Sequence, residues 1–423
     1  MFRLNFKKAF NSLFVFLFIF SIFNDNFLVD HLGENALKGI FLVFILVNIP
    51  KLYRNAMNWK MLGEQKWFFV FLALNYFVMI FNPGNGDRLF ENSLLIISML
   101  VVVVFFIDYD LKLLLYMNWF TLMVSALICF FNSPISEWTF RKTGGTGDPN
   151  EFAAEMLSFL FLSVYLYTQN KNLIFIILSS LGFLYSIMFA ASMSSFLVLG
   201  IMALLILIRY MSMSFTKSLV ATSMSLMVAI LLLMIFQEKL ESTETVSNLL
   251  GRTEQTGTAF TRFNSWKAGL NMFVDKPLMG VGMRMYAENS PKYSSVYLSE
   301  DSVAPHNLFI ELIAECGIII FLAFMIFLYD LMSKYFRIIV HTKYFWLYMS
   351  LVAYLLMGLT LGVTYNKFLW LSIAMLMNIQ HLLHMEALEE PRRKPEFIDI
   401  GQQGPQTLKN KIAQNSGNLK QLR

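Results

Sequence analysis

Charged residues are scarce in this chain of 423 residues. Only 14% of them are Asp, Glu, Lys or Arg, well below the roughly 25% of an average soluble domain. Hydrophobic residues make up 57%, and 43 residues are phenylalanine. Because water cannot solvate that much apolar surface, we expect a lipid bilayer to surround most of the chain. The composition therefore excludes an ordinary soluble protein.

Cysteine and histidine are also rare, with two and five residues respectively. Cys129 and Cys316 lie inside apolar runs without metal-ligand spacing, so we expect packing residues rather than a disulfide. The sequence contains neither an HExxH motif nor a cluster of His and Cys that would hold zinc. We therefore expect neither a metal nor another cofactor.

Apolar runs recur along the whole chain and are typical of membrane-spanning helices. They lie near 9–24, 36–49, 67–81, 93–107, 112–131, 151–168, 172–190, 194–210, 217–236, 306–331, 344–363 and 368–385. These runs predict an all-α, polytopic membrane protein with about twelve transmembrane helices. The basic N-terminus lacks a small-x-small cleavage site after its apolar run, so the first run is expected to remain as a helix.

Lysine and arginine are distributed unevenly between the loops. Alternate loops, beginning with the one around Lys51, are basic, and so is the C-terminal tail. Basic loops stay on the cytoplasmic side of a membrane, so we expect both termini to be cytoplasmic. The net charge of +5 reflects this bias and not a nucleic-acid partner. The predicted organisation is helices 1–9 in 1–236, a large external loop in 237–305, helices 10–12 in 306–385, and a loosely ordered tail in 386–423.

The large external loop is expected to be partly helical. In TRFNSWKAGLNMF, four apolar residues recur at helical spacing. They are Phe263, Trp266, Leu270 and Phe273. A Pro-x-x-Gly-x-Gly segment then ends the pattern as a turn. An amphipathic helix on the outer leaflet and a helix packed on the membrane domain fit these residues equally well.

The stretch SVAPHNLFIELIAECG, residues 302–317, carries the candidate chemistry. His306 is the histidine that the topology places at the external mouth of the membrane domain, and a neutral imidazole there could act as a general base. A helix cap or a hydrogen bond to a carbonyl is the simpler alternative. Asn307, Glu311 and Glu315 follow at intervals of four residues and share one helix face. They fit either a polar groove or an ion pair between helices, with Glu315 the deeper and more structural residue.

Cations of the external loop are a second candidate. Arg262 lies one helical turn before Trp266, and a guanidinium at a membrane interface suits a phosphate because it bonds two oxygens at once. The simpler interpretation is that most cations in this loop are solvated.

Three stretches together resemble the O-antigen ligase family, which includes O-antigen polymerases and related bacterial glycan transferases. TGGTGDPNEFAAEML is similar to a Gly-rich, Pro-Asn segment that leads into a helix. TRFNSWKAGLNMFVDKPLMGVGM is similar to an Arg-x3-Trp helix with a Pro-x-x-Gly-x-Gly turn, and HNLFIELIAECG to a His-Asn-x9-Gly signature. The order of these stretches, the chain length and the large late external loop all match the family. The resemblance therefore covers nearly the whole chain.

The resemblance implies a metal-independent, inverting glycosyl transfer on the periplasmic face of the bacterial inner membrane. The implied donor is an undecaprenyl diphosphate-linked glycan, and the acceptor is a lipid A-core or a growing glycan. His306 is then the general base and Arg262 holds the donor diphosphate. The candidate substrate-binding residues are Arg141, Asn150, Arg252, Trp266, Arg284, Asn307 and Glu311.

The chain departs from the family pattern at one arginine. Many ligases carry it after a Ser/Thr pair, whereas here Ser194 or Ser195 stands at that place. Three other arginines could replace it, or the diphosphate is held differently. These are Arg141, Arg252 and Arg284. Ile320 also stands where the histidine signature has a small residue, so ligase and polymerase both remain open.

Two other classes of protein fit the composition. A transporter or flippase of lipid-linked oligosaccharide should show ionisable residues near mid-membrane in repeated halves. This chain instead concentrates its polar residues near the external face, which favours the enzyme. A polytopic scaffold without activity is the third alternative.

Overall fold

The computed structural model describes residues 6–82, 86–131, 142–190, 192–211, 257–294, 304–362 and 364–389. Within these ranges the regular elements are all helices, which confirms the all-α class. The helices are α1 (Phe6–Phe23), α2 (Asp25–Leu32), α3 (Glu34–Ala56), α4 (Trp59–Gly63), α5 (Lys66–Phe81), α6 (Gly86–Phe106), α7 (Leu111–Phe131), α8 (Pro149–Asn170), α9 (Ile174–Ala190), α10 (Met193–Met211), α13 (Gly257–Asp275), α14 (Tyr286–Tyr293), α15 (Leu308–Ser333), α16 (Phe336–His341), α17 (Phe345–Met357) and α18 (Lys367–Glu389). The chain divides into a unit of 1–381 and a unit of 382–423.

Several helices have the length and composition of membrane spans. In the described residues, five qualify, namely Glu34–Ala56, Arg88–Phe106, Leu111–Phe131, Leu308–Ser333 and Lys367–Met385. The pair α1 and α2, bent by 99°, is a sixth candidate, and four more apolar helices are shorter. These helices support a multi-pass membrane protein. The count of twelve and the side of each loop stay predictions, and the expected run at 217–236 lies outside the described residues.

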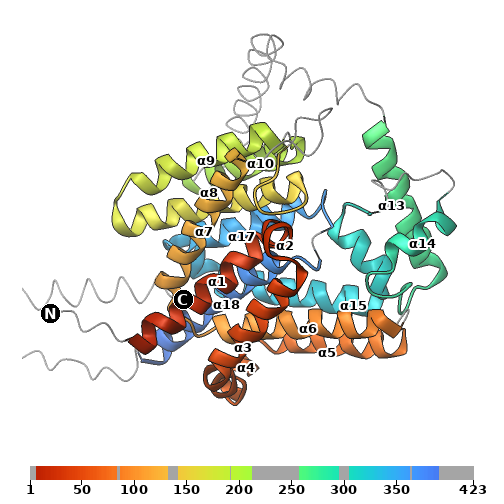
Figure 1. The fold of residues 1–423 in the computed structure, drawn as a ribbon, viewed down its shortest axis with the longest axis horizontal. Helices are drawn as coiled ribbons and strands as arrows, with labels where there is room; N and C mark the ends of the chain where they lie inside the picture. The colour runs from red at the N-terminus through yellow and green to blue at the C-terminus, as the bar shows by residue number, and fades with distance from the viewer. Residues whose placement is uncertain are drawn as a thin grey trace, which may run out of the picture. The chain divides into compact units, whose positions relative to one another are not determined.

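Aromatic side chains fill the space between α5, α15 and α18. Phe71 of α5 stacks on Trp370 of α18 with ring centroids 5.8 Å apart, and it lies 5.4 Å from the ring of Phe324 on α15. The Trp370 indole N–H donates to the Thr364 carbonyl at 3.1 Å. Figure 1 shows α5 and α15 running side by side. Part of the large phenylalanine content therefore packs these helices together, as aromatic pairs do in cores.

The Gly-rich segment before α8 lies against the bend between α1 and α2. The Phe27 N–H donates to the Gly145 carbonyl at 3.1 Å. A Cβ on Gly145 would lie 2.1 Å from Oδ1 of Asn24, so only glycine allows this approach. Asp148 then caps α8, with its Oδ1 accepting from the Asn150 N–H at 2.5 Å. The segment thereby fixes where α8 begins relative to the bend.

A second close contact interrupts α15 at Gly317. This residue has φ 74° and ψ −176° inside the helix, a backbone region that is nearly reserved for glycine. The turn after α13 bonds to α15 on both sides of the break. The Val281 N–H donates to the Ala314 carbonyl at 2.9 Å, and the Ile318 N–H donates to the Pro277 carbonyl at 2.8 Å. The Pro-x-x-Gly-x-Gly turn is therefore attached to the helix that begins after His306.

Gly317→Ala should lower the thermal stability of the protein. The backbone conformation alone costs a non-glycine residue about 1–3 kcal/mol, and the new Cβ would lie 2.4 Å from the Leu278 carbonyl oxygen. Gly39→Ala is the matched control, since a Cβ there meets nothing within 4 Å and alanine favours a helix. Thermal unfolding of both variants in detergent measures the difference. An unchanged midpoint for Gly317→Ala would contradict the argument.

The two cysteines are free and buried, as the sequence predicts. Cys129 lies in α7, and Cys316 lies immediately before the break in α15. Both therefore act as small packing residues in the part of the chain that the structure describes.

Candidate functional site

His306 precedes α15 in an unusual backbone conformation. Its φ is 46°, in the left-handed region that residues other than glycine seldom occupy, and its side chain is half-buried. The next two residues are anchored to the end of α17. The Leu308 N–H donates to the Gly358 carbonyl at 2.7 Å, and Asn307 Nδ2 donates to the Leu359 carbonyl at 3.0 Å. Strained residues held in this way concentrate at functional sites, which makes His306 the focus of the candidate site.

Asn307 is the N-cap of α15. Its Oδ1 accepts from the Phe309 and Ile310 N–H groups at 3.0 and 3.1 Å. Both ends of the side-chain amide are thus engaged, one with the helix and one with the Leu359 carbonyl. These bonds give Asn307 a positioning role for the backbone around His306.

Glu315 connects three separate parts of the chain. Its Oε2 accepts from the Arg284 N–H at 2.8 Å and from the Tyr365 hydroxyl at 2.5 Å. Its Oε1 accepts from the Tyr286 N–H at 3.0 Å. Both oxygens are therefore satisfied although the residue is buried, as a buried carboxylate requires. Glu315 joins α15 to the turn before α14 and to the segment before α18.

The two tyrosines around Glu315 stay protonated and can donate. Burial, with the Glu315 and Glu311 carboxylates, raises the pKa of Tyr286. Burial, with the Cys316 thiol and the same carboxylates, raises the pKa of Tyr365 well above the ordinary value. The Tyr286 hydroxyl donates to the Ser265 carbonyl on α13. Tyr286 therefore links the α14 region to the helix that carries Arg262.

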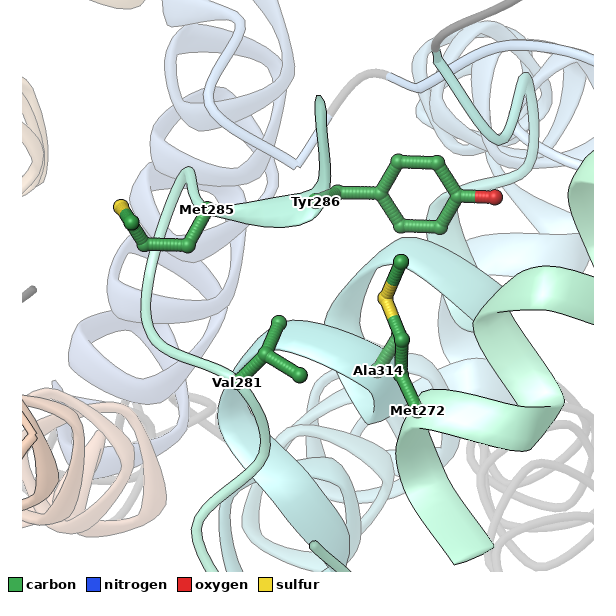
Figure 2. Packing of buried hydrophobic residues seen from close by; sticks show 5 residues of the cluster. All are labelled: Met272, Val281, Met285, Tyr286 and Ala314. Carbon is green, nitrogen blue, oxygen red and sulfur yellow. The ribbon is translucent and has the colours of Figure 1, made fainter. Parts of the chain in front are cut away.

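A small apolar cluster completes this junction. Figure 2 shows the Tyr286 ring beside the Met272 side chain, with Ala314 and Val281 close by. Met272 comes from α13 and Ala314 from α15. All are buried, as is the fifth member, Met285. The cluster holds the short helix α14 and the turn before it against α15.

The helix α13 confirms that TRFNSWKAGLNMF is helical. One face of α13 is packed on α15, where a Cβ on Gly269 would lie 2.6 Å from Cγ2 of Ile310. On the other face, Phe263 and Leu270 are 63% and 49% exposed. Figure 1 shows α13 and α14 beside one end of α15. The helix thus packs on α15 and also keeps an apolar outer face. A helix packed on the membrane domain and an amphipathic helix on the leaflet surface are therefore compatible alternatives.

Arg262 and Trp266 lie on α13, one turn apart. Both are half-buried. The Trp266 indole N–H is buried and has no hydrogen-bond partner among the residues that the structure describes. The same holds for Nδ2 of Asn264, a residue that sequence reasoning did not single out. The helix α13 therefore carries buried polar donors at Asn264 and Trp266, and it packs against the helix that His306 precedes.

The other candidate residues have separate surroundings. Arg284 donates from Nη1 to Oε2 of Glu91 at 3.1 Å, so its guanidinium already pairs with a carboxylate. Glu311 accepts from the Thr364 hydroxyl at 2.7 Å. Asn150 is the second residue of α8. Arg141 and Arg252 lie outside the described residues.

The serines at the missing arginine position lie at the start of α10. Ser195 is buried, and its hydroxyl donates to Oγ of Ser192 at 3.1 Å. Oγ of Ser194 lies 3.2 Å from the same atom. Both serines thus contact the hydroxyl of Ser192, and the Ser195 hydroxyl also lies 3.7 Å from Sδ of Met357. Neither side chain brings a positive charge to this place.

A polar cavity of about 250 Å³ lies next to the Glu311 region. It is lined by Ile22, Asp25, Thr146, Glu151, Glu155, Gly362, Tyr365, Asn366 and Lys367. Gly362 also borders Glu311, whose Oε1 would lie 3.0 Å from a Cβ on that glycine. Sequence reasoning missed the three acidic residues of this cavity. Two of them, Glu151 and Glu155, stand in an apolar run, a signal that would have marked them.

Comparison with known proteins assigns part of the chain to a family. Residues 175–328 match the family model described as O-antigen ligase, which confirms the resemblance found in the sequence. The match includes α13, His306 and the break in α15. None of the curated proteins matches the chain.

Proposed function

We propose that this chain, whose residues 175–328 belong to the O-antigen ligase family, is a membrane glycosyltransferase of the ligase or polymerase type. It takes a glycan from an undecaprenyl diphosphate-linked donor and attaches it to an acceptor hydroxyl on the periplasmic face. The observation that carries the proposal is the position of His306. This half-buried histidine is held in a left-handed conformation beside the junction of α13 and α15.

The reaction needs a base on one side of the sugar and a cation on the other. His306 takes the proton of the acceptor hydroxyl as its oxygen attacks the anomeric carbon. The carbon–oxygen bond to the diphosphate breaks with its electron pair going to the diphosphate. Because the acceptor oxygen attacks from the opposite face, the configuration at the anomeric carbon inverts. Arg262 stabilises the negative charge that grows on the leaving diphosphate. No step of this scheme requires a metal.

Arg262→Ala should lower kcat/KM for the lipid-linked donor about tenfold to a hundredfold, the fold-change that corresponds to the loss of a hydrogen bond to a charged group. Arg262→Lys should recover only part of the loss, because an ammonium cannot bond two phosphate oxygens in the same plane. The measurement is transfer by the purified protein at varied donor concentration. Lys267→Ala is the matched control, since this exposed cation lies on the same helix. Equal effects of the two alanine variants would contradict the role of Arg262.

Ligase and polymerase are separated by the lipopolysaccharide of a strain that lacks the gene. If the enzyme is a ligase, the core carries no glycan and polymer accumulates on the lipid carrier. If it is a polymerase, the core carries a single repeat unit. A strain with normal long-chain glycan on its core would contradict both forms of the proposal.

A further inference from the structure

The polar cavity at the start of α8 is built by three segments far apart in the sequence. Ile22 and Asp25 flank the bend between α1 and α2, Thr146 and Glu151 belong to the Gly-rich segment and its helix, and Tyr365 precedes α18. Close packing of the bend against Gly145 holds two of these segments together. The cavity is therefore a feature of the folded membrane domain.

Glu155 lines this cavity, and contacts among the described residues do not account for the burial of its carboxyl group. It is 0% exposed, and neither carboxylate oxygen has a hydrogen-bond partner among the residues that the structure describes. A buried polar group without a partner costs free energy, and such groups in native proteins call for a specific explanation. Because Glu155 lines the cavity, a ligand in the cavity can supply the missing donors.

The lining selects the kind of ligand. Three carboxyl groups, of Asp25, Glu151 and Glu155, offer a diphosphate no positive charge, and their oxygens can accept hydrogen bonds from hydroxyl groups. Lys367 adds donors, and Ile22 adds an apolar surface. A sugar ring combines hydroxyl donors, oxygen acceptors and apolar C–H faces. In the described part of the chain, no three acidic or His/Cys side chains converge as metal ligands would.

The size of the cavity limits the ligand to a single ring. Its volume of about 250 Å³ is below the roughly 300–1,000 Å³ of pockets for drug-sized ligands. A polyprenyl chain or a whole oligosaccharide would not fit.

We propose that this cavity is the acceptor subsite, and that it holds one hydroxyl-bearing sugar ring of the acceptor glycan with Glu155 as a hydrogen-bond acceptor. The inference rests on the proposed function, because it assumes that the acceptor is a sugar. Two contacts join the cavity to the candidate site. Gly362 borders both the cavity and Glu311, and Tyr365 lines the cavity while donating to Glu315.

A cysteine in the cavity wall tests this inference without requiring glycan transfer. Thr146→Cys places a thiol on the cavity lining with little change in volume, whereas the two native cysteines are buried and do not line the cavity. The purified full-length variant is labelled with a small methanethiosulfonate reagent in the presence of glucose, galactose or N-acetylglucosamine. At least one sugar should slow the labelling. Ser93→Cys, at a half-buried position of α6 outside the cavity lining, is the control whose labelling sugars should leave unchanged.

Glu155→Gln in the Thr146→Cys background tests the unpartnered carboxylate. Glutamine keeps the volume but replaces one carboxyl oxygen with an amide nitrogen that cannot accept a hydrogen bond, so the sugar concentration that gives half-maximal protection should rise about tenfold. Three results would overturn the inference. Either no sugar slows the labelling of the thiol, or the Glu155→Gln variant is protected at the same sugar concentration, or inorganic pyrophosphate protects the thiol better than the sugars do.

The same measurement separates this inference from the proposed function. His306→Ala in the Thr146→Cys background should keep the sugar protection while transfer is lost. Protection together with normal transfer by His306→Ala refutes the catalytic assignment and leaves the sugar site standing. Loss of transfer without any protection refutes the acceptor subsite alone.

Discussion

His306→Ala should reduce glycan transfer about 10²–10⁴-fold, the usual contribution of a positioned general base. The imidazole removes the proton of the acceptor hydroxyl in the proposed mechanism, and alanine has no group that can do so. The measurement is transfer by purified protein at saturating donor and acceptor, together with surface glycan in a complemented deletion strain. Normal transfer by this variant would rule out His306 as the base.

A structural role for His306 needs its own control, because its backbone is left-handed. Asparagine tolerates this conformation better than most residues but provides no basic nitrogen. His306→Asn should therefore keep the thermal stability of the protein and still lose transfer. His341→Ala changes an exposed histidine on α16 and should leave transfer unchanged. If the His306→Asn variant keeps normal transfer, the histidine stabilises the backbone conformation and does not take part in proton transfer.

Local signals in the sequence predicted the parts of the site that depend on neighbouring residues. Helical spacing of Phe263 and Trp266 predicted α13, and the following glycines predicted the turn, which the φ of 66° at Gly280 confirms. The apolar run after His306 predicted α15. These features depend on a few residues in a row, and the backbone preferences of those residues are visible in the sequence.

Contacts between distant segments could not be predicted in the same way. Glu315 was interpreted as structural, yet its partners at Arg284, Tyr286 and Tyr365 follow only from the folded chain. The apolar run 306–331 predicted a helix without a break. The break at Gly317 could not be predicted, because its cause is the turn that packs on it. Periodicity shows which face of a helix is apolar, but it does not show which segment covers that face.

The missing family arginine shows how this limit affects function. Ser194 and Ser195 were recognised as a departure, and the structure gives both a neighbouring hydroxyl as partner. Of the three proposed replacements, Arg284 pairs with Glu91, and the other two lie outside the described residues. The proposed diphosphate site therefore depends mainly on Arg262.

Glu315→Ala should destabilise the junction of α13, α14 and α15 by several kcal/mol. The change leaves the Arg284 and Tyr286 N–H groups and the Tyr365 hydroxyl without their acceptor, and each unsatisfied buried donor costs about 1–3 kcal/mol. Freed from α15, the peptide bond after Arg284 should become accessible to trypsin. Thermal unfolding and limited trypsin digestion in detergent measure the two effects.

Graded variants separate the hydrogen bonds of Glu315 from its bulk. Glu315→Gln keeps one accepting oxygen and should lose less stability than Glu315→Ala, whereas Tyr365→Phe removes a single donor and should cost about 1 kcal/mol. Glu288→Ala is the matched control, because this carboxylate pairs with Arg88 at 3.0 Å on the surface, where ion pairs contribute little. The expected order follows the number of donors left without an acceptor. If Glu288→Ala and Glu315→Ala lowered the midpoint equally, Glu315 would not be the residue that fastens the turn after α13 to α15.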